Sequence, residues 1–422
     1  MKHSKTPEPA RMDAVDNPYT PNAGARPEIL IGRDEQTQAF RTLLTRLRRG
    51  RTNQSMIITG LRGVGKTVLL NGFRTIAQEE NGEVIEFEAV KHDEGRFRQV
   101  LASQLKAALL RLSPRARWTD RGRHAAAVLS AFAVSVGADG EWSIGWDVPP
   151  AEGVADHRDL GLDLTDVLVA VGEAAAEQGE GIVLLINEVQ FLDSPQLEAL
   201  IQAIHKTVQR SLPVTFVGAG LPQIAELVGY ARSYAERLFT FPRIDSLDHD
   251  EAVAALREPA AAEGAVYDDD AVELVVEITT GYPSFIQELG YQVWTVAEND
   301  RIHREDVEPA REAYEAKLDS SFFRVRLDRA SPLQTAYMRA MAELGPEPQK
   351  AGDVAALLER ASTQLGSVRA ELIGMGLLFT PEHGYAAFTV PDFDRFMKRA
   401  VPVLEVPPVV SRGARRAPAT EV

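Results

Sequence analysis

The motif that organises this 422-residue chain is Gly60-Leu61-Arg62-Gly63-Val64-Gly65-Lys66-Thr67, which matches the pattern G-x-x-x-x-G-K-[ST] at every fixed position. The apolar, β-branched run at residues 55–59 predicts a buried strand before it, and residues 68–74 continue with the spacing of a helix. Glycines let backbone N–H groups turn inward, and the N-terminus of a helix adds partial positive charge, so this arrangement captures phosphate. The sequence therefore predicts that the chain binds ATP or GTP.

The residues of this phosphate loop have separate expected roles. Lys66 is expected to reach the β- and γ-phosphates, and the hydroxyl of Thr67 is expected to ligate Mg²⁺. The residues expected to surround the nucleotide form one continuous segment: Gly60, Leu61, Arg62, Gly63, Val64, Gly65, Lys66, Thr67 and Val68.

Composition narrows the classes of protein that the chain can belong to. Its length suggests two or three domains, and 45% hydrophobic residues are ample for real cores. The absence of cysteine excludes disulfides, thiolate zinc sites and thiol catalysis, and the histidines lack metal-ligand spacing. A net charge of −15 argues against non-specific coating of nucleic acid, although one domain can still carry a basic face.

No segment of the sequence has the pattern of a membrane span or an export signal. The first nine residues lack an apolar core, and the longest mostly apolar stretch, residues 125–138, is shorter than the ~20 residues needed to cross a bilayer. We therefore predict a soluble cytoplasmic protein with no membrane partner.

Alternating strand and helix patterns predict an α/β fold with a doubly wound parallel sheet. Residues 83–90, 182–186 and 214–218 have strand patterns, and helical patterns lie between them. The continuous apolar run at 182–186 is typical of a central strand buried on both faces, and ligands bind at the carboxyl ends of such strands. The pattern loosens at about 113–162, an expected insertion in which runs at 132–136 and 142–146 around a Gly/Asp turn predict a β-hairpin.

The sequence divides into five expected parts. Three helical patterns followed by two β runs describe a winged helix near the C-terminus, and the β pattern stops after residue 243, which predicts a helical lid. The parts are a disordered or loosely draped tail at 1–26, the P-loop core at 27–245, the lid at 246–330, the winged helix at 331–400 and a second tail at 401–422.

Asn187-Glu188 follows the buried strand at 182–186, where a Walker B motif ends. In such motifs an aspartate supports Mg²⁺ through water, and the next residue, a glutamate, positions or deprotonates the attacking water. Glu188 is present, but Asn187 replaces the aspartate and offers only a neutral carbonyl, so Mg²⁺ affinity and turnover are expected to be lower. Gln190 and Asp193 lie close enough to contribute, and Asp193 is expected to cap the helix that starts at Ser194. An ordinary strand-to-helix cap is the alternative interpretation of Asn187-Glu188.

In their order along the chain, several motifs over about residues 27–399 resemble a bacterial AAA+ ATPase of the archaeal and origin-recognition initiator type. They are Gly32-Arg33-Asp34, the phosphate loop, Leu185-Ile186-Asn187-Glu188-Val189-Gln190, Gly218-Ala219-Gly220-Leu221-Pro222, Gly281-Tyr282-Pro283 and the C-terminal winged helix. The resemblance implies ATP and Mg²⁺ as cofactors, and it implies that Ile31 and Arg33 pack against adenine and ribose.

The sequence departs from this family at three places. Asn187 is the first, and Gly218 and Ala219 stand where the family often has a polar sensor at the end of a strand. In the lid, residues 281–284 contain no arginine at the matching place, which is nearer to the signal-transduction ATPases called STAND. The departures put efficient hydrolysis in doubt but not nucleotide binding.

Three basic features have competing interpretations. Arg237 sits where such ATPases place an arginine finger for a neighbour's γ-phosphate, with Arg232 as its competitor, and a solvated helix arginine is the alternative. The basic run at 115–124 either contacts DNA or forms a solvated face. The winged helix offers Gln364, Ser367 and Arg369 on its third helix, yet its near-neutral charge is also typical of a protein-docking module.

Two functions remain in competition. The first is an ATPase with slow or regulated hydrolysis that assembles with double-stranded DNA, as initiators do, and self-associates. The second is a nucleotide-gated STAND-like switch whose winged helix docks a protein partner.

Overall fold

The computed structural model describes residues 12–22, 24, 25, 27, 29–90, 94–112, 119–134, 148–232 and 234–408. The chain divides by its packing into two compact units, with the boundary between residues 314 and 315. The N-terminal unit contains the phosphate loop, a sheet and a group of helices that follows the sheet. The C-terminal unit contains a smaller helical bundle with a short sheet.

A five-stranded parallel sheet forms the centre of the N-terminal unit, with strand order β2-β3-β4-β1-β5. The strands are β1 (Ser55–Thr59), β2 (Gly82–Glu88), β3 (Gly181–Asn187), β4 (Val214–Gly220) and β5 (Phe239–Thr240). Strand β3 lies between β2 and β4, and residues 182–186 are completely buried, because a central strand of a doubly covered sheet must be apolar on both faces. The predicted parallel α/β sheet is confirmed.

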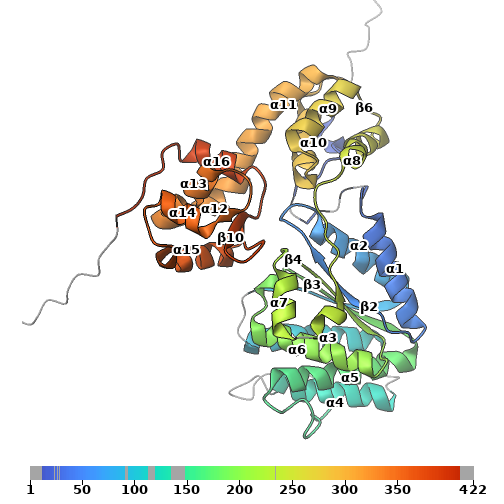
Figure 1. The fold of residues 1–422 in the computed structure, drawn as a ribbon. Helices are drawn as coiled ribbons and strands as arrows, with labels where there is room; N and C mark the ends of the chain where they lie inside the picture. The colour runs from blue at the N-terminus through green and yellow to red at the C-terminus, as the bar shows by residue number, and fades with distance from the viewer. Residues whose placement is uncertain are drawn as a thin grey trace, which may run out of the picture. The chain divides into compact units, whose positions relative to one another are not determined.

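Helices cover both faces of this sheet (Figure 1). Helices α1 (Asp34–Arg48) and α2 (Lys66–Glu79) pack on one face, where Phe40 stacks on Phe73 with ring centroids 4.2 Å apart. Helices α3 (Glu94–Leu112), α5 (Leu160–Gln178) and α6 (Ser194–Gln209) pack on the other, and α7 (Ile224–Ala231) follows β4. Asp193 caps α6 in a capping box with Gln196, as the sequence predicts.

The insertion differs from its predicted hairpin. Residues 120–134 form helix α4 (Asp120–Val134), which packs on α5 and α3, so the first predicted strand is helical as far as Val134. Phe132 is completely buried in the resulting core. The prediction was wrong here because a buried apolar run satisfies a helix as well as a strand, and tertiary packing decides between them. The rest of the predicted hairpin lies outside the described residues.

The helices after the sheet form a small bundle within the N-terminal unit. They are α8 (His249–Ala262), α9 (Asp269–Thr279), α10 (Pro283–Val296) and α11 (Arg304–Lys317), with short paired strands β6 (Val266–Tyr267) and β7 (Arg301–Ile302) between them. Asp248 begins α8 with a capping box, and Pro283 occupies the first turn of α10, where its missing N–H is not needed. Helix α11 continues across the boundary between the two units.

Part of the predicted N-terminal tail is folded onto this bundle, which corrects the interpretation of residues 1–26 as disordered or loosely draped. Residues 13–22, here called the N-terminal strap, include Tyr19, which is 1% exposed and donates its hydroxyl to the Leu256 carbonyl at 2.6 Å. Gly290 of α10 leaves room for the ring, because a Cβ there would lie 2.8 Å from it. Trp294 Nε1 donates to the Asp13 carbonyl at 3.0 Å. The low hydrophobicity of the segment predicts disorder, but the burial of the single residue Tyr19 holds the segment on the bundle.

Tyr19→Ala is expected to lower the free energy of unfolding of the N-terminal unit by about 3 kcal/mol, because the lost ring leaves a cavity between α8 and α10. Denaturant unfolding followed by far-UV circular dichroism measures the change. Val15→Ala is the matched control within the strap, since Val15 is 86% exposed. Equal stability of Tyr19→Ala and the wild-type protein would contradict the docked strap.

The C-terminal unit is built from helices and a three-stranded antiparallel sheet of order β8-β10-β9. Its elements are a π-helical turn (Leu318–Phe323), α12 (Arg324–Leu327), α13 (Pro332–Leu344), β8 (Gln349–Lys350), α14 (Ala351–Leu357), α15 (Ser362–Gly374), β9 (Leu378–Phe379), β10 (Tyr385–Phe388) and α16 (Phe393–Ala400). Ser331 and Gln334 cap α13 reciprocally. Phe323 stacks on Phe396 at 5.1 Å between ring centroids, which joins the segment before α13 to α16.

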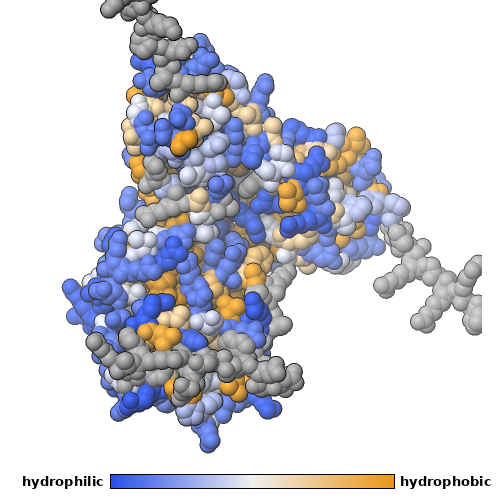
Figure 2. Space-filling model, turned by 180° about the vertical axis from the view of Figure 1, so that it is seen from behind, coloured by the Kyte–Doolittle hydropathy of each residue, from blue (hydrophilic) through white to orange (hydrophobic). Residues whose placement is uncertain are grey.

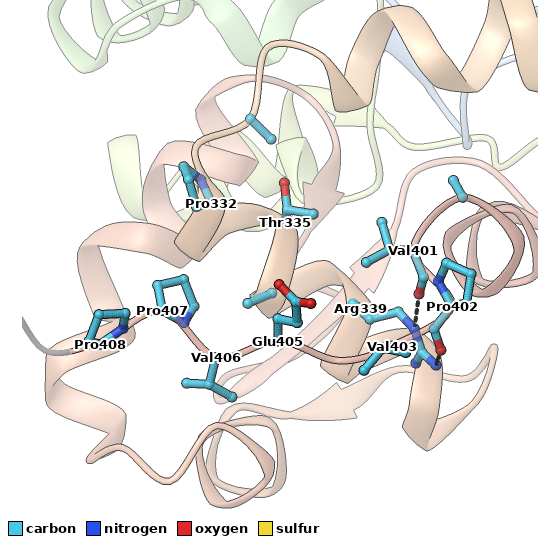
Figure 3. A pocket seen from close by; sticks show the side chains of 13 residues that line it. Pro332, Thr335, Arg339, Val401, Pro402, Val403, Glu405, Val406, Pro407 and Pro408 are labelled. Atoms are coloured by element: carbon cyan, nitrogen blue, oxygen red, sulfur yellow. Dashed lines mark hydrogen bonds between the residues drawn. The ribbon is translucent and has the colours of Figure 1, made fainter.

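The described part of the C-terminal tail, residues 401–408, is anchored rather than loose. Arg339 of α13 is 7% exposed and donates to the carbonyls of Val401 at 2.7 Å and Pro402 at 3.3 Å. Arg360 donates to the Pro407 carbonyl at the other end of the segment. Figure 3 shows the segment passing beside α13. Residues of both line a cavity of about 780 Å³.

Hydrophilic side chains predominate on the face shown in Figure 2, with hydrophobic residues in separate patches. In the described part of the chain, no helix combines the length and the apolar character that crossing a membrane requires.

Candidate nucleotide-binding site

The phosphate loop connects β1 to α2 and depends on glycine at particular positions. Gly63 and Gly65 have φ angles of 90° and 95°, which side chains disfavour. A Cβ on Gly60 would lie 2.3 Å from the Ile244 carbonyl oxygen, so only glycine fits. Helix α2 begins at Lys66 with no side-chain cap, which leaves its first N–H groups for an anion.

Lys66 lies against the loop that it follows. It is 5% exposed, and its Nζ donates to the carbonyls of Gly60 at 2.9 Å and Leu61 at 2.7 Å. Burial lowers the pKa of Lys66 to about 8, partly opposed by the negative charge of Glu188. The ammonium group is therefore held by neutral carbonyls at the place where the sequence expects phosphate oxygens.

The two residues predicted to support Mg²⁺ are in direct contact. Asn187 at the end of β3 donates its Nδ2 to the hydroxyl oxygen of Thr67 at 3.1 Å. The Oδ1 atom of Asn187 is buried and has no hydrogen-bond partner among the described residues. A hydroxyl oxygen can ligate Mg²⁺ directly, and an amide oxygen can accept a hydrogen bond from one of its bound waters, so these residues fit the ion.

Glu188 adopts an unusual backbone conformation directly after β3. Its φ of 55° and ψ of 40° lie in the left-handed region, which is uncommon for a residue with a side chain. Its carboxylate accepts from Nε2 of Gln190 and lies 3.8 Å from the guanidinium of Arg62 in the phosphate loop. The carboxylate therefore lies at the phosphate loop, where the sequence predicts the catalytic base.

Arg33 has a different setting from the one expected. It is 6% exposed, and its guanidinium donates to the carbonyls of Gly32 at 2.7 Å, Val64 at 3.0 Å and Asp245 at 2.9 Å. Burial lowers its pKa, opposed by Glu251 and Asp245. The structure thus shows Arg33 fixing the phosphate loop to the segment after β5. Ile31 and Val68 are both half-buried.

The start of α10 contacts the phosphate loop through residues whose roles the sequence did not reveal. Tyr282 donates its hydroxyl to the Arg62 carbonyl, and the Ser284 N–H donates to the Gly63 carbonyl at 3.1 Å. Burial raises the pKa of Tyr282 above its usual range, so the phenol stays protonated as a donor. The hydroxyl of Ser284 is buried without a hydrogen-bond partner in the described part of the chain. In the sequence, Gly281-Tyr282-Pro283 indicates the family resemblance and the missing arginine, but not these two contacts.

The two candidate arginine fingers differ in their surroundings. Arg232 lies 3.3 Å from Glu198 of α6, and this ion pair holds it to its own subunit. Arg237, in the 3₁₀ turn Ala235–Arg237, is exposed, and no ion pair involves it among the residues described. Of the predicted DNA contacts, residues 115, 117 and 118 lie outside the described part, whereas Arg121, Arg123 and His124 are on α4.

Comparisons with known proteins agree with this geometry. Residues 29–217 match a family described as AAA ATPase domain, and residues 320–397 match a domain of unknown function, DUF8462. A search of curated proteins finds none that matches.

Two solved structures illustrate the structural likeness. A Walker-type ATPase of Pyrococcus abyssi is 14% identical over 88% of this chain and 97% of that chain, with a TM-score of 0.56. The Aeropyrum pernix ORC1 protein in complex with DNA is 15% identical over 88% of this chain and 94% of that chain, with a TM-score of 0.45. The parallel sheet with its flanking helices and phosphate loop is the α/β P-loop fold of AAA+ ATPases.

Proposed function

We propose, from the premise that residues 29–217 match an AAA ATPase domain, that this chain binds and hydrolyses ATP. The observation that carries the proposal is the meeting of Lys66, Thr67, Asn187 and Glu188 at the carboxyl ends of β1 and β3. Parallel sheets place ligands at this edge, and these four side chains are the types that phosphoryl transfer needs. Measurements of ATP hydrolysis in Glu188→Gln and of ATP binding in Lys66→Ala test it.

Each residue has a proposed role. Lys66 exchanges its two carbonyl partners for phosphate oxygens, a stronger charge-assisted pair. Thr67 and Asn187 would hold Mg²⁺, which would supply positive charge against the phosphates. Glu188 orients the attacking water and accepts its proton.

We propose that hydrolysis is slow or regulated. Asn187 contributes no negative charge beside Thr67, and Arg62 lies 3.8 Å from the carboxylate of Glu188. The lid contacts the phosphate loop with Tyr282 and Ser284 and has no arginine at this place, which is the STAND-like feature of the chain. An incoming phosphate would therefore alter contacts that also involve the lid.

Asn187→Asp is expected to reduce the Mg²⁺ concentration for half-maximal turnover about tenfold, or ~1.4 kcal/mol, because a carboxylate adds charge where the amide has none. Phosphate release measured over a Mg²⁺ titration gives the value. Asn81→Asp is the matched control, since Asn81 is exposed beyond the end of α2. An unchanged Mg²⁺ requirement in Asn187→Asp would remove Asn187 from the metal site.

We also propose the domain division expected from the sequence, a core at 27–245, a lid from 246 and a winged helix at 331–400, but with the lid ending near residue 314 instead of the expected 330. The order helix, strand, two helices and hairpin in α13, β8, α14, α15, β9 and β10 supports the winged helix. The segment 315–330 packs with the C-terminal unit, which supports ending the lid near residue 314.

The first proposed role for this ATPase is assembly on double-stranded DNA. Gln364 and Ser367 on α15 are exposed and Arg369 is half-buried, so α15 offers a polar outer face. On α16, the consecutive residues Lys398 and Arg399 are both exposed. These residues have the chemistry for groove and phosphate contacts.

A second proposed role, a nucleotide-gated switch that docks a protein, is favoured by the pairing of basic side chains in the C-terminal unit. Arg399 binds both carboxylate oxygens of Asp319, and Arg339 pairs with Glu343 at 2.6 Å. Arg395 lies 3.2 Å from Asp392, and Arg360 holds Pro407. Paired arginines have less to offer to DNA phosphates, so this observation favours the switch over the DNA role.

Fluorescence anisotropy with random-sequence duplexes, ATP present and several salt concentrations, separates the two roles. A DNA-associated protein loses affinity linearly with log salt, and Lys398→Ala reduces the slope by about 1. Lys206→Ala, an exposed lysine on α6, is the matched control. No duplex binding at low salt would leave the switch as the remaining role.

Self-association is proposed on the surface around Arg237. Helix α7 contacts the turn that carries Arg237, and it exposes Tyr230 at 80% and Leu227 at 41%. Exposed apolar side chains beside an exposed arginine suit an interface in which the arginine reaches a neighbour's γ-phosphate.

Arg237→Ala is expected to leave ATP affinity unchanged and to lower assembly-stimulated turnover about tenfold or more, because a finger acts on a neighbour's phosphate. Sedimentation velocity and phosphate release over a range of protein concentrations measure both quantities. Arg232→Ala is the comparison variant, because Arg232 is held by Glu198. A protein that stays monomeric under saturating ATP and DNA would count against the finger.

A further inference from the structure

Gln190 uses both ends of its side-chain amide at the edge of the sheet where Glu188 lies. It belongs to the 3₁₀ turn Val189–Phe191, directly after Glu188. Its Nε2 donates to Oε2 of Glu188, and its Oε1 accepts from the Leu221 N–H at 3.1 Å. A carboxylate can only accept and a backbone N–H can only donate, so the two partners fix the orientation of the amide. Glutamine satisfies both at once.

The end of β4 is shaped to admit this amide. A Cβ on Gly220 would lie 2.7 Å from Oε1 of Gln190 and 2.9 Å from Val189. A Cβ on Gly218 would lie 3.1 Å from Val189. Side chains at the end of β4 would therefore displace the turn that carries Gln190. Glycine at positions 218 and 220 therefore leaves space for the amide of Gln190, which comes from the turn after the neighbouring strand β3.

A hydrogen bond next to Leu221 links this contact to the phosphate loop. Gly220 accepts through its carbonyl from the Gly60 N–H at 3.2 Å, one residue before Leu221. Arg62 of the phosphate loop also contacts Glu188 directly, because its guanidinium lies 3.8 Å from Oε2 of the carboxylate. In the described part of the chain, both recorded contacts of this carboxylate are to Oε2. The second oxygen, Oε1, is thereby kept for another partner.

We propose that Gln190, in the turn after β3, is the positioning residue that orients the carboxylate of Glu188. The inference rests on the proposed ATPase function and deepens it. The amide holds one oxygen of the carboxylate and ties it to the strand next to the phosphate loop. Because both ends of the amide are bonded to groups of the protein, its loss is expected to change the rate of hydrolysis and to leave nucleotide binding intact.

The test compares Gln190→Ala and Gln190→Glu in the full-length chain, with kcat from phosphate release and ATP affinity from calorimetry. Gln190→Ala removes a hydrogen bond to a charged group, so kcat is expected to fall about ten- to a hundredfold with an ATP affinity within twofold of wild type. Gln190→Glu keeps the size and the acceptor for Leu221 but sets a second carboxylate against Glu188, so its loss is at least as large. A purely structural role would be preserved by the glutamate.

Gly220→Ala gives an independent disturbance of the same contact. The added Cβ meets Oε1 of Gln190, so this variant is expected to lose turnover although Gln190 and Glu188 are both present. In a double-mutant cycle with Gln190→Ala, the two losses are expected to be strongly non-additive. Gln78→Ala is the matched control, because Gln78 is exposed near the other end of α2.

The outcomes separate this inference from the function on which it rests. A wild-type protein without Glu188-dependent turnover would overturn the proposed ATPase and this inference together. Wild-type turnover that depends on Glu188 but is unchanged in Gln190→Ala would overturn only the role of Gln190. Weaker ATP binding in Gln190→Ala, in proportion to the lost kcat/KM, would also overturn it.

Discussion

Glu188→Gln is expected to reduce kcat for ATP hydrolysis by about 10²–10⁴-fold, the range for losing a general base, while ATP binding persists. The change keeps the size of the side chain and its place after β3, and it removes the basic carboxylate beside the phosphate loop. Lys66 and Thr67 are untouched, so the phosphate contacts remain. Single-turnover hydrolysis of labelled ATP measures the chemical step, and equilibrium binding measures the affinity.

Glu226→Gln is the matched control for this experiment, since Glu226 is exposed on α7. Glu188→Gln also loses the ion pair with Arg62, so a modest change in its ATP affinity is compatible with Glu188 as the general base. Turnover that is the same in Glu188→Gln and in the control would show that Asn187-Glu188 does not end a Walker B motif.

The phosphate loop and the sheet could be predicted because their signals are local. Gly63 and Gly65 need positive φ angles that the motif guarantees by its glycines, and residues 182–186 are apolar because both faces of β3 are covered. The α/β P-loop fold is confirmed. The roles of Lys66, Thr67 and Glu188 stay predictions, although the structure places them at one edge of the sheet.

Features that depend on a partner distant in sequence could not be predicted. Tyr19 is anchored by the space above Gly290, about 270 residues away, so composition alone classed its segment as a tail. Tyr282 and Ser284 contact the phosphate loop through carbonyls, which no motif records. The sequence places Gln190 near Glu188, but its contact with the Leu221 N–H depends on the missing Cβ of Gly220.

Arg33 lies beside the phosphate loop, but its contacts differ from those that the resemblance implies. The resemblance places it against the nucleotide, and the structure does place it beside the phosphate loop. Its guanidinium, however, is occupied by three carbonyls, which joins Gly32, Val64 and Asp245. A single sequence cannot distinguish an arginine that packs against adenine and ribose from one that holds the phosphate loop through backbone carbonyls.

Lys66→Ala is expected to weaken ATP binding more than tenfold, or at least ~1.5–3 kcal/mol, the value of a charge-assisted hydrogen bond to phosphate. The loss is expected to be confined to nucleotide binding, because the ammonium group of Lys66 donates only to the carbonyls of Gly60 and Leu61 in the described structure. Burial of the ammonium group lowers its pKa, so removing the group also removes a cost of desolvation. The variant is therefore expected to be folded, with an unfolding transition no lower than that of the wild type without ATP.

Titration calorimetry with ATP and Mg²⁺, with Lys206→Ala as the control, measures the effect. ATP binding as tight in Lys66→Ala as in the control would refute the assignment of Gly60–Thr67 as the phosphate loop, whatever the C-terminal unit binds.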